Sequence, residues 1–407
     1  LKSDKMIYCN TCVYPMVAAT ALTADDEGKC SGCKVSEQRE IIDWDKRLEE
    51  FKKLIDRYRS NSDYDVVIPV SGGKDSYFQV HFALEHGLRP LLVTYHGDAF
   101  TDEGEKNLQN MRRVFDCDHL IYRPSSTLLK RLNRIGLKLQ GDNNWHNHAG
   151  IFTYPIQVAV KHRIPIILWG EHGFMDIAGM YSYNDYVEFT AKYRYEHSLH
   201  GFDWFDFTDE GLEKNGRPDI KEGISEKELV WLKYPSDTEI DDVGVRGIYL
   251  SNYVKWSGSQ NADLVESKYG WKPFESEQER TYRKISNLDD IHENGIHDYM
   301  KFIKFGYGRA TDHASKDIRD GLITRDKGIE YVNHYDHVKP MKSLNHWLEY
   351  VQMKERDFDE IADSFRDPRV WFIRNGKWVK DCIDGELREF GDVLLEKNQR
   401  EKYKELS

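Results

Sequence analysis

The feature that most constrains the fold is residues 65–76, DVVIPVSGGKDS, because it joins an apolar run to a glycine-rich turn. The run is dominated by β-branched side chains, which is typical of a strand buried on both faces of a parallel sheet. A helix-compatible segment follows over residues 77–86. The stretch therefore predicts a strand, a tight loop and a helix, which is the repeating unit of an α/β fold.

The turn itself has the composition of an anion-binding loop. Two adjacent glycines, Gly72 and Gly73, let backbone N–H groups turn inward without an obstructing Cβ. The hydroxyls of Ser71 and Ser76, the ammonium of Lys74 and the start of a helix all favour a bound anion. The sequence therefore predicts a phosphate site in this turn.

This loop is not the Walker-type phosphate loop, which requires a glycine where this chain has Ile68 and a serine or threonine where it has Asp75. SGGKDS instead resembles the pyrophosphate loop (PP-loop) of the ATP pyrophosphatase family. Members of that family split ATP into AMP and pyrophosphate to activate a carbonyl-type oxygen. The alternative is an ordinary strand-to-helix turn, and a match over the whole of residues 71–76 at the end of a buried strand argues against it.

Further apolar runs alternate with helix-compatible segments, which predicts a doubly wound, mostly parallel sheet. The additional strands are expected at residues 90–95, 119–122, 164–169 and 247–254. In open α/β sheets the ligand lies at the carboxyl ends of the strands. Residues 96–98 and 170–171 follow two of these strands and should therefore share one rim with the PP-loop.

This rim supplies the other expected contacts to ATP and Mg²⁺. Gly97 and Gly170 would let an adenine or a ribose approach the backbone. Asp75, Asp98 and Glu171 carry oxygen ligands that could hold Mg²⁺ directly or through water. Each carboxylate alone is equally typical of a helix cap or a solvated position, so we expect at least one of them to serve the metal.

Four of the six cysteines form two Cys-x2-Cys pairs near the start of the chain, which is not a disulfide pattern. The separation of Cys9 and Cys12 from Cys30 and Cys33 is typical of tetrahedral zinc, with two thiolates presented by each turn. A four-cysteine site is closed, so its expected role is structural. A redox pair, an iron–sulfur cluster and a docking surface for a partner are the alternatives.

Residues 306–319, GYGRATDHASKDIR, combine glycines, basic groups and hydrogen-bonding side chains, which is unusual for a packing surface. Lys316 and Arg319 are three residues apart, so a helix would point both in one direction. We expect them to hold pyrophosphate from the side opposite Lys74, as catalytic residues together with Lys74 and Asp75. A solvated charged face is the alternative reading of the spacing.

A chain of 407 residues is longer than one small domain, so we expect one large α/β unit with appended pieces. The pieces are a zinc knuckle, a linker helix, a PP-loop ATP-binding domain and a helical C-terminal region, at residues 6–34, 35–60, 61–256 and 257–407. An aromatic-rich insertion lies around residues 173–235. It either packs on the protein or on a second subunit, which keeps a homo-oligomer open, or offers aromatic faces to a sugar or base ring.

The charge balance, 58 Lys and Arg against 70 Asp and Glu, gives a net charge of −12. This balance argues against a broad nucleic-acid surface, although a local basic groove could survive it. No apolar run approaches the ~18 residues of a membrane span, and no signal-peptide apolar region is visible. We therefore expect a cytoplasmic protein without a membrane span and without a nucleic-acid partner.

Two further stretches, residues 8–15 (YCNTCVYP) and 294–299 (NGIHDY), add to the PP-loop and the 306–319 segment. With these motifs the chain resembles, from Met6 over nearly its whole length, the N-acetyl sugar amidotransferases of bacterial surface-polysaccharide synthesis. SGGKDS marks only the superfamily, whereas the two stretches are specific to this family. The resemblance implies ATP-dependent conversion of an acetamido group into an acetamidino group through an O-adenylyl intermediate. The substrate would be an N-acetylated, nucleotide-linked sugar, typically a uronic acid, in lipopolysaccharide or O-antigen synthesis.

The resemblance also implies cofactors and partners: ATP, catalytic Mg²⁺, structural Zn²⁺, and ammonia from a separate glutaminase and its channelling subunit. That pair would be similar to the one that feeds histidine biosynthesis. In agreement, the sequence around Cys117 and Cys382 does not have the pattern of a glutaminase nucleophile. The candidate proton acceptors are His148, His172, His297 and His313.

Two other function classes share features with this sequence. A tRNA-thiolating PP-loop enzyme also combines zinc knuckles with such a loop, but it requires a persulfide-carrying cysteine or a cluster, and a basic RNA surface. A nucleotide-binding scaffold without catalysis is the third class, and the intact loop argues against it.

Overall fold

The computed structural model describes residues 5–59, 63–286 and 288–406. A five-stranded parallel sheet in the order β3-β2-β1-β4-β5 forms its centre. The strands are β1 (Val66–Pro69), β2 (Pro90–Tyr95), β3 (His119–Tyr122), β4 (Ile166–Trp169) and β5 (Arg246–Tyr249). The order changes direction at β1, so the predicted doubly wound parallel sheet is confirmed, and the loop after β1 lies at the topological switch point.

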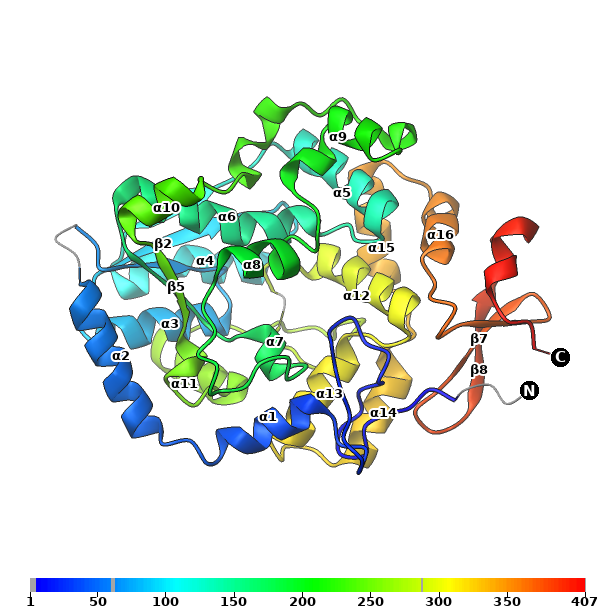
Figure 1. Cartoon of the computed structure of the whole chain (residues 1–407), viewed down its shortest axis with the longest axis horizontal. Coiled ribbons are helices and arrows are strands. Elements are labelled where there is room, and N and C mark those ends of the chain that lie inside the picture. The colour runs from blue at the N-terminus through cyan, green and yellow to red at the C-terminus, as the bar shows by residue number, and fades with distance from the viewer. Residues whose placement is uncertain (1–4, 60–62, 287, 407) are drawn as a thin grey trace.

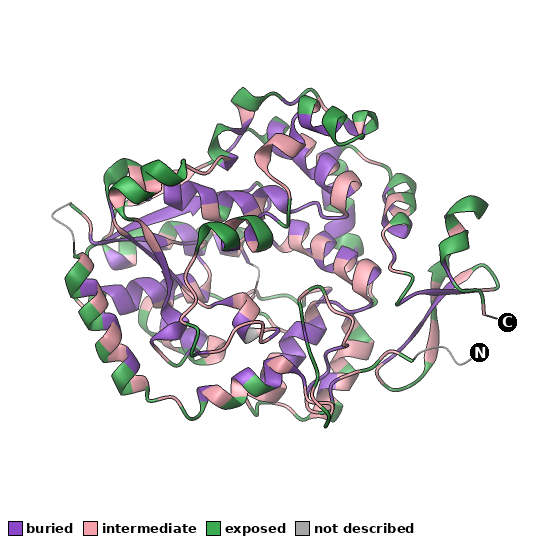
Figure 2. Cartoon of the chain, viewed as in Figure 1, coloured by how far each residue is buried: buried purple, intermediate pink, exposed green. Residues whose placement is uncertain are grey.

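Helices cover both faces of the sheet, which is why its strands are continuous apolar runs (Figures 1 and 2). Successive side chains of a strand point to opposite faces, so Val66 and Ile68 join one core cluster and Val67 joins the other. The first cluster includes residues of α2 (Trp44–Tyr58), α3 (Lys74–Glu85), α4 (Asp102–Phe115) and α11 (Gly258–Tyr269). The second includes residues of α5 (Ser126–Gln140) and α6 (Trp145–His162).

The helix predicted to link the cysteine segment to the sheet is interrupted. The chain forms α1 (Ser31–Arg39), breaks, and starts again at α2. The break is stabilised by Asp43, whose side chain accepts a hydrogen bond from the Lys46 N–H and caps α2.

The aromatic-rich insertion folds into short helical segments that pack on α6. The Phe207 ring stacks on Trp145 with the ring centroids 3.8 Å apart, and Tyr193 and Leu229 belong to the same core cluster. Packing on the chain itself therefore accounts for these buried side chains. The segments are α7 (Gly173–Asp176), α8 (Ala191–Tyr193), η1 (Arg194–Ser198), η2 (Trp204–Phe207), α9 (Asp209–Lys214), η3 (Pro218–Ile220), η4 (Glu226–Leu232) and, just after them, α10 (Asp237–Val243).

The C-terminal region is helical as predicted, but it ends in a small antiparallel sheet that the sequence analysis did not predict. The helices are α12 (Ile291–Phe305), α13 (Arg309–Arg319), α14 (Arg325–Tyr335), α15 (Met341–Val351) and α16 (Glu355–Ser364). The sheet has the order β6-β7-β8 and lies beside both chain ends (Figure 1). Its strands are β6 (Phe372–Arg374), β7 (Lys377–Asp381) and β8 (Leu387–Asp392), followed by η6 (Lys397–Lys402).

A hairpin signal for this sheet is present in the sequence. Asn375 and Gly376 form the two-residue turn between β6 and β7, with φ angles of 51° and 74°. Two positive φ angles are what a type I′ hairpin turn requires, and Asn-Gly is its preferred pair. The aromatic and β-branched residues on either side of this pair complete the signal.

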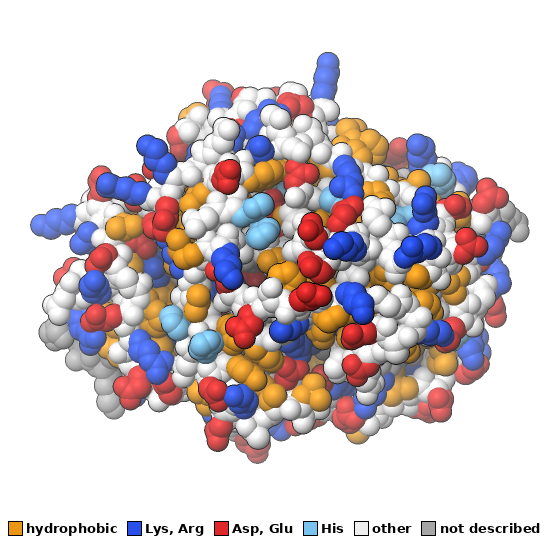
Figure 3. Space-filling view, turned by 180° about the vertical axis from the view of Figure 1, so that it is seen from behind, with side chains coloured by type: hydrophobic (Ala, Val, Ile, Leu, Met, Phe, Trp, Pro, Cys, Tyr) orange, Lys and Arg blue, Asp and Glu red, His pale blue; other side chains and the backbone are white. Residues whose placement is uncertain are grey.

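No helix in the described part of the chain is long and apolar enough to cross a membrane. On the face seen in Figure 3, Lys and Arg side chains are interspersed with Asp and Glu side chains rather than gathered into one basic surface. Both signs are therefore mixed on that face, in keeping with the sequence balance.

Candidate functional site

The predicted PP-loop connects β1 to α3 and is held in shape by its own hydroxyls. The Ser71 N–H donates to Ser76 Oγ at 3.0 Å, and the Gly73 N–H donates to Ser71 Oγ at 3.3 Å. Gly72 has a φ of +83°, and a Cβ there would lie 2.7 Å from the backbone nitrogen of Leu108 on α4. Both the backbone angle and the space therefore favour glycine at this position.

Two cavities meet at this loop, and Ser71, Ser76 and Asp289 line both of them. The strand-end cavity has a volume of about 330 Å³ and is lined by Gly97 and Gly170, which follow β2 and β4. The helix cavity has a volume of about 240 Å³ and is lined by the loop and by residues of α13. The predicted rim is thus present, and the two cavities together form the candidate site.

The walls of the strand-end cavity are largely apolar and aromatic. Tyr95, Phe100, Phe152 and Trp169 contribute rings, and the amide groups come from Gln79, Asn144, Asn147 and Asn294. A few polar groups in an aromatic wall suit a flat ring such as adenine. Close packing also favours glycine at position 97, because a Cβ on Gly97 would lie 2.7 Å from the amide oxygen of Asn147.

The helix cavity is rich in charge of both signs. Its basic side chains are Lys74, Arg283, Arg309 and Lys316. Its acidic side chains are Asp75, Glu171, Asp289, Asp312, Asp317 and Asp320. Since acidic groups outnumber basic ones here, a polyphosphate would be bound more favourably together with divalent cations than alone.

Four charged residues of the predicted site line the helix cavity. Lys74 Nζ lies 2.5 Å from Asp75 Oδ2, and Asp75 Oδ1 accepts from the Asn261 side-chain amide at 3.1 Å. Lys316 Nζ lies 2.9 Å from Glu171 Oε2. The structure therefore places Lys74 and Lys316 around one cavity, and their contacts to pyrophosphate stay a prediction.

Two predicted site residues lie elsewhere. Asp98 is exposed and accepts a hydrogen bond from the Tyr350 hydroxyl at 3.0 Å, and it lines neither cavity among the described residues. Arg319 does not line the helix cavity. It donates to the carbonyl oxygen of Ile177 at 2.9 Å, and its Nη2 lies 3.4 Å from Cys30 Sγ. Arg319 is the last residue of α13, one turn beyond Lys316, and its side chain lies beside sulfur atoms that are far away in sequence.

Asp289 and Asp290, just before α12, are site residues that the sequence analysis missed. Burial raises the pKa of Asp289, while its hydrogen bond to Ser71 and the charge of Lys74 act in the opposite direction. Burial and the Glu293 carboxylate raise the pKa of Asp290 well above its usual value. Asp290 Oδ2 accepts from the Asn144 amide at 2.8 Å. The two adjacent acids were themselves the available signal.

The candidate proton acceptors occupy different places. His148 lines the strand-end cavity and His313 lines the helix cavity. Burial and the charge of Arg283 hold the pKa of His313 well below its usual value, and one ring nitrogen lies 2.6 Å from the Thr281 hydroxyl. His172 caps α7 by accepting from the Met175 N–H at 3.1 Å. His297 lies on α12 beside Asp142.

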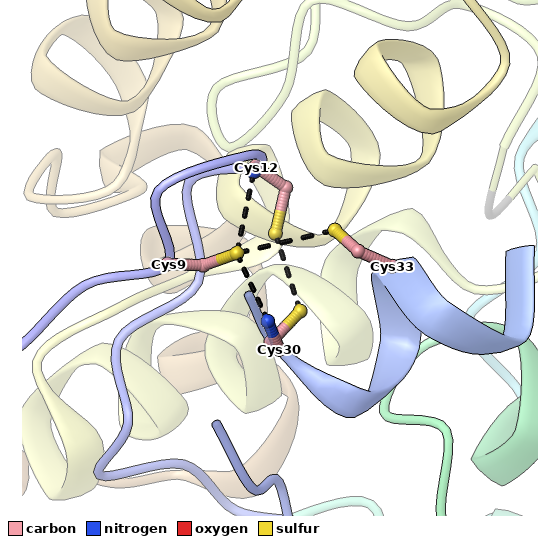
Figure 4. A group of neighbouring side chains, drawn as sticks. All are labelled: Cys9, Cys12, Cys30 and Cys33. Carbon is pink, nitrogen blue, oxygen red and sulfur yellow. Dashed lines mark hydrogen bonds between the residues drawn. The ribbon is translucent and has the colours of Figure 1, made fainter. Parts of the chain in front are cut away.

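The four cysteines of the predicted knuckle converge (Figure 4). Their sulfur atoms all lie within 4.8 Å of one another, and all four residues are buried. The Cys9–Cys33 and Cys12–Cys30 sulfur distances are 3.9 and 3.6 Å. Two thiolates on one tetrahedral zinc are about 3.8 Å apart, since Zn–S bonds are ~2.3 Å. The residues present therefore fit a structural zinc ion.

The cysteine segment packs against α13 and α14 (Figure 1). Arg325 of α14 donates to the carbonyl oxygens of Cys12 and Cys9 at 3.1 and 3.0 Å. The Tyr14 hydroxyl hydrogen-bonds to Asp312, which itself lines the helix cavity. The knuckle thus packs against α13, and α13 supplies one wall of the candidate site.

Comparison with known proteins supports the expected setting. Residues 271–381 match the family described as LPS biosynthesis protein WbpG-like, C-terminal domain. Lipopolysaccharide is a bacterial surface polysaccharide, so the match agrees with the resemblance found in the sequence motifs. The matched segment contains Asp289, Asp290 and all of α13. No curated protein sequence matches the chain significantly.

Among solved structures, 33 chains match significantly. One is the NH3-dependent NAD synthetase of Campylobacter jejuni subsp. jejuni in complex with the nitrate ion. It is 13% identical, and the alignment covers 58% of this chain and 100% of the synthetase with a TM-score of 0.27. A TM-score this low supports no conclusion, so the fold class here follows from the strand order and pairing alone.

Proposed function

Because the chain carries the WbpG-like C-terminal domain of LPS biosynthesis proteins, we propose that it is an ATP-dependent amidotransferase of lipopolysaccharide or O-antigen synthesis. Its substrate would be an N-acetylated, nucleotide-linked sugar. The acetamido group of that sugar would become an acetamidino group, with ammonia as the nitrogen donor and AMP and pyrophosphate as the other products.

The observation that carries the proposal is the meeting of two unlike cavities at one glycine-rich loop. The strand-end cavity has aromatic walls suited to adenine, and the helix cavity has the basic side chains suited to pyrophosphate. Ser71 and Ser76 lie at the junction. ATP bound across the junction would place its α-phosphate between the cavities, where an acceptor oxygen could attack it.

The reaction needs such a site because an amide carbonyl is a poor electrophile and its oxygen is a poor leaving group. The acetamide oxygen would attack the α-phosphorus, and the bond from that phosphorus to the bridging oxygen of pyrophosphate would break. Ammonia would then add to the carbon of the O-adenylyl imidate, and AMP would leave with the former amide oxygen. A proton released from the nitrogen completes the balance.

The residues around the helix cavity can stabilise the departing pyrophosphate. The loop N–H groups and the ammonium groups of Lys74 and Lys316 would bind its oxygens, and preorganised donors of this kind contribute strongly to catalysis. The loop and the cavity walls would hold the reacting atoms in line, which lowers the entropic part of the barrier.

The donors present fit Mg²⁺, which prefers carboxylate and phosphate oxygens. Asp75, Glu171 and Asp289 line the helix cavity, and Asp75 belongs to the PP-loop. Mg²⁺ bound there would neutralise charge on the phosphates and polarise the α-phosphate.

Ammonia would come from a separate glutaminase with its channelling subunit. Neither of the two cysteines outside the knuckle lines a cavity of the candidate site. Burial and the charge of Asp116 raise the pKa of Cys117 to about 11, and Cys382 is buried in the turn before β8. A nucleophilic cysteine instead needs a lowered pKa. The same features disfavour the tRNA-thiolating alternative, which needs a sulfur-carrying cysteine.

The test is a product assay with ATP, Mg²⁺, ammonium chloride and a panel of UDP-linked N-acetylated sugars, including uronic acids. We expect AMP and pyrophosphate in equal amounts, with a sugar product that is lighter by about one mass unit after oxygen is replaced by NH. Lys74→Ala should lower kcat/KM by about 10²-fold or more. Lys161→Ala, a change at an exposed lysine of α6, is the matched control. Release of ADP in place of AMP would overturn the proposal.

A further inference from the structure

A second group of potential metal ligands lies beside the strand-end cavity. Asp142 follows α5, His148 is in the first turn of α6, and His200 follows η1. One ligand atom of each lies within 4.8 Å of the others. His148 also lines the strand-end cavity. The three residues thus come from separate segments of the chain, and His148 places the group at the cavity wall. The function proposed above uses none of these side chains.

The two oxygens of Asp142 have different surroundings. Oδ1 accepts from the Asn144 N–H at 2.9 Å and lies 2.8 Å from His297 Nδ1. Oδ2 faces the Nδ1 atoms of His148 and His200 at 3.7 and 3.8 Å. These two distances are too long for hydrogen bonds. One oxygen is thus held in place, and the other faces two imidazole nitrogens without bonding to either.

His148 Nδ1 is an orphaned polar atom. It is buried and has no hydrogen-bond partner within the described ranges. Buried polar atoms are normally paired, so such an atom calls for an unseen water or ion. If the cluster were only a hydrogen-bonded network, His148 Nδ1 would lie within about 3.2 Å of an acceptor or donor.

The spacing suits a metal ion better than it suits direct bonds. Two N or O ligands at 2.0–2.2 Å from a tetrahedral ion are about 3.4 Å apart, and the two Asp142–histidine distances exceed this spacing by only a few tenths of an ångström. His200 has a φ of +55°, a backbone angle that is uncommon for residues other than glycine and recurs at functional sites. The His297 contact orients the Asp142 carboxylate in the way that outer hydrogen bonds orient metal ligands.

We propose that Asp142, His148 and His200 bind one divalent transition metal ion, with zinc as the first candidate. Two imidazoles and one carboxylate form a donor set that suits zinc and similar ions better than magnesium or calcium. Three protein ligands leave a coordination position for water or substrate. If the proposed function holds, an oxygen of a substrate bound at the strand-end cavity takes this position. The metal site itself does not depend on that function.

The test is a cobalt titration of the full-length protein after removal of metal and reduction of thiols. Wild-type protein should bind two equivalents, of which only one gives the intense thiolate-to-cobalt absorption of the cysteine cluster. His200→Ala and His148→Ala should bind one equivalent and keep that absorption. His162→Ala, a change at an exposed histidine of α6, should bind two. Far-UV circular dichroism checks that each variant is folded.

A wild-type measurement keeps the test independent of the variants. X-ray absorption of the protein loaded with two equivalents of zinc should show a nitrogen and oxygen shell in addition to sulfur. One equivalent bound by wild type, a sulfur-only spectrum, or two equivalents retained by both folded histidine variants would each overturn the site. None of these readouts uses catalysis, so failure of the metal site and failure of the proposed function are distinguishable.

Discussion

At the scale of single residues, Lys316 and Arg319 of α13 differ in what their side chains contact. Lys316 and Arg319 have similar charge and lie on one helix, yet Lys316 faces Glu171 and Arg319 faces the cysteine sulfur atoms. Cys33 Sγ lies 3.5 Å from Arg319 Nε across a separation of 286 residues. Helical spacing alone cannot show such a contact. The prediction that both side chains would line one phosphate cavity was therefore wrong for Arg319.

These two residues should therefore give different phenotypes. Lys316→Ala is expected to lower kcat/KM for ATP by about 10²-fold while zinc content stays unchanged, because one phosphate donor is lost. Arg319→Ala is expected to weaken zinc retention and lower Tm, because a cation beside the thiolates is removed. Zinc content, Tm and kcat/KM should be measured on both variants. Equal loss of zinc from both would contradict the assignment.

Gly72 offers a prediction about stability. Gly72→Ala meets both a φ of +83° and the Leu108 backbone nitrogen at 2.7 Å, whereas Gly87→Ala meets a φ of +68° with no atom within 4 Å. Gly87→Ala should cost about 1 kcal/mol of unfolding free energy from the backbone angle. Gly72→Ala should cost at least ~1 kcal/mol more, because the overpacked loop must shift. Urea denaturation of both variants measures the difference, and equal costs would count against the close approach.

At the scale of elements, α13 links the cysteine cluster to the candidate site. Its side chains line the helix cavity, and contacts from Arg319 and Tyr14 tie it to the cysteine segment. A structural zinc ion that holds this segment would therefore also hold one wall of the helix cavity in place.

Removal of zinc should loosen α13 before it affects the sheet. After chelation under reducing conditions, hydrogen exchange should speed up in residues 309–319 and in the cysteine segment, while β1 and β2 stay protected. Added zinc should restore the protection. Unchanged exchange in α13 after verified zinc loss would show that the cysteine cluster does not support the site.

How far the sequence predicts these elements depends on where their signal lies. Continuous apolar runs identified β1, β2 and β4, because burial on both faces leaves a local signature. The hairpin of β6 and β7 has an equally local Asn-Gly signal, and it was overlooked. Asp289 and Asp290 carry no such local signal. They enter the site only because the folded chain brings them to the strand-end cavity, which both line.

At the scale of the whole molecule, the proposed function gives the chain an ATP site and an acceptor site and leaves the supply of ammonia to separate subunits. Of the described cysteines, four are clustered at the knuckle, Cys117 has a raised pKa and Cys382 is buried. In this proposal neutral ammonia reaches the junction of the two cavities through a sheltered path, since ammonium is not a nucleophile.

The proposed separation of the ATP site from the supply of ammonia predicts which nitrogen sources support the reaction. Ammonium chloride should support AMP formation, with a rate that rises with pH toward the ammonia pKa because NH3 is the reactive form. Glutamine should support it only when a glutaminase and its channelling subunit are added. Turnover with glutamine by the purified chain alone would show that a glutaminase activity resides in this chain.

The central claim is that the acetamide oxygen of the sugar attacks the α-phosphate of ATP held by the PP-loop. Substrate carrying ¹⁸O in the acetamido carbonyl tests it most directly, with ammonia as donor and mass spectrometry of all phosphate products. The account predicts one ¹⁸O atom in the phosphate of AMP and none in pyrophosphate. Label in inorganic phosphate together with ADP, or AMP free of label, would contradict it.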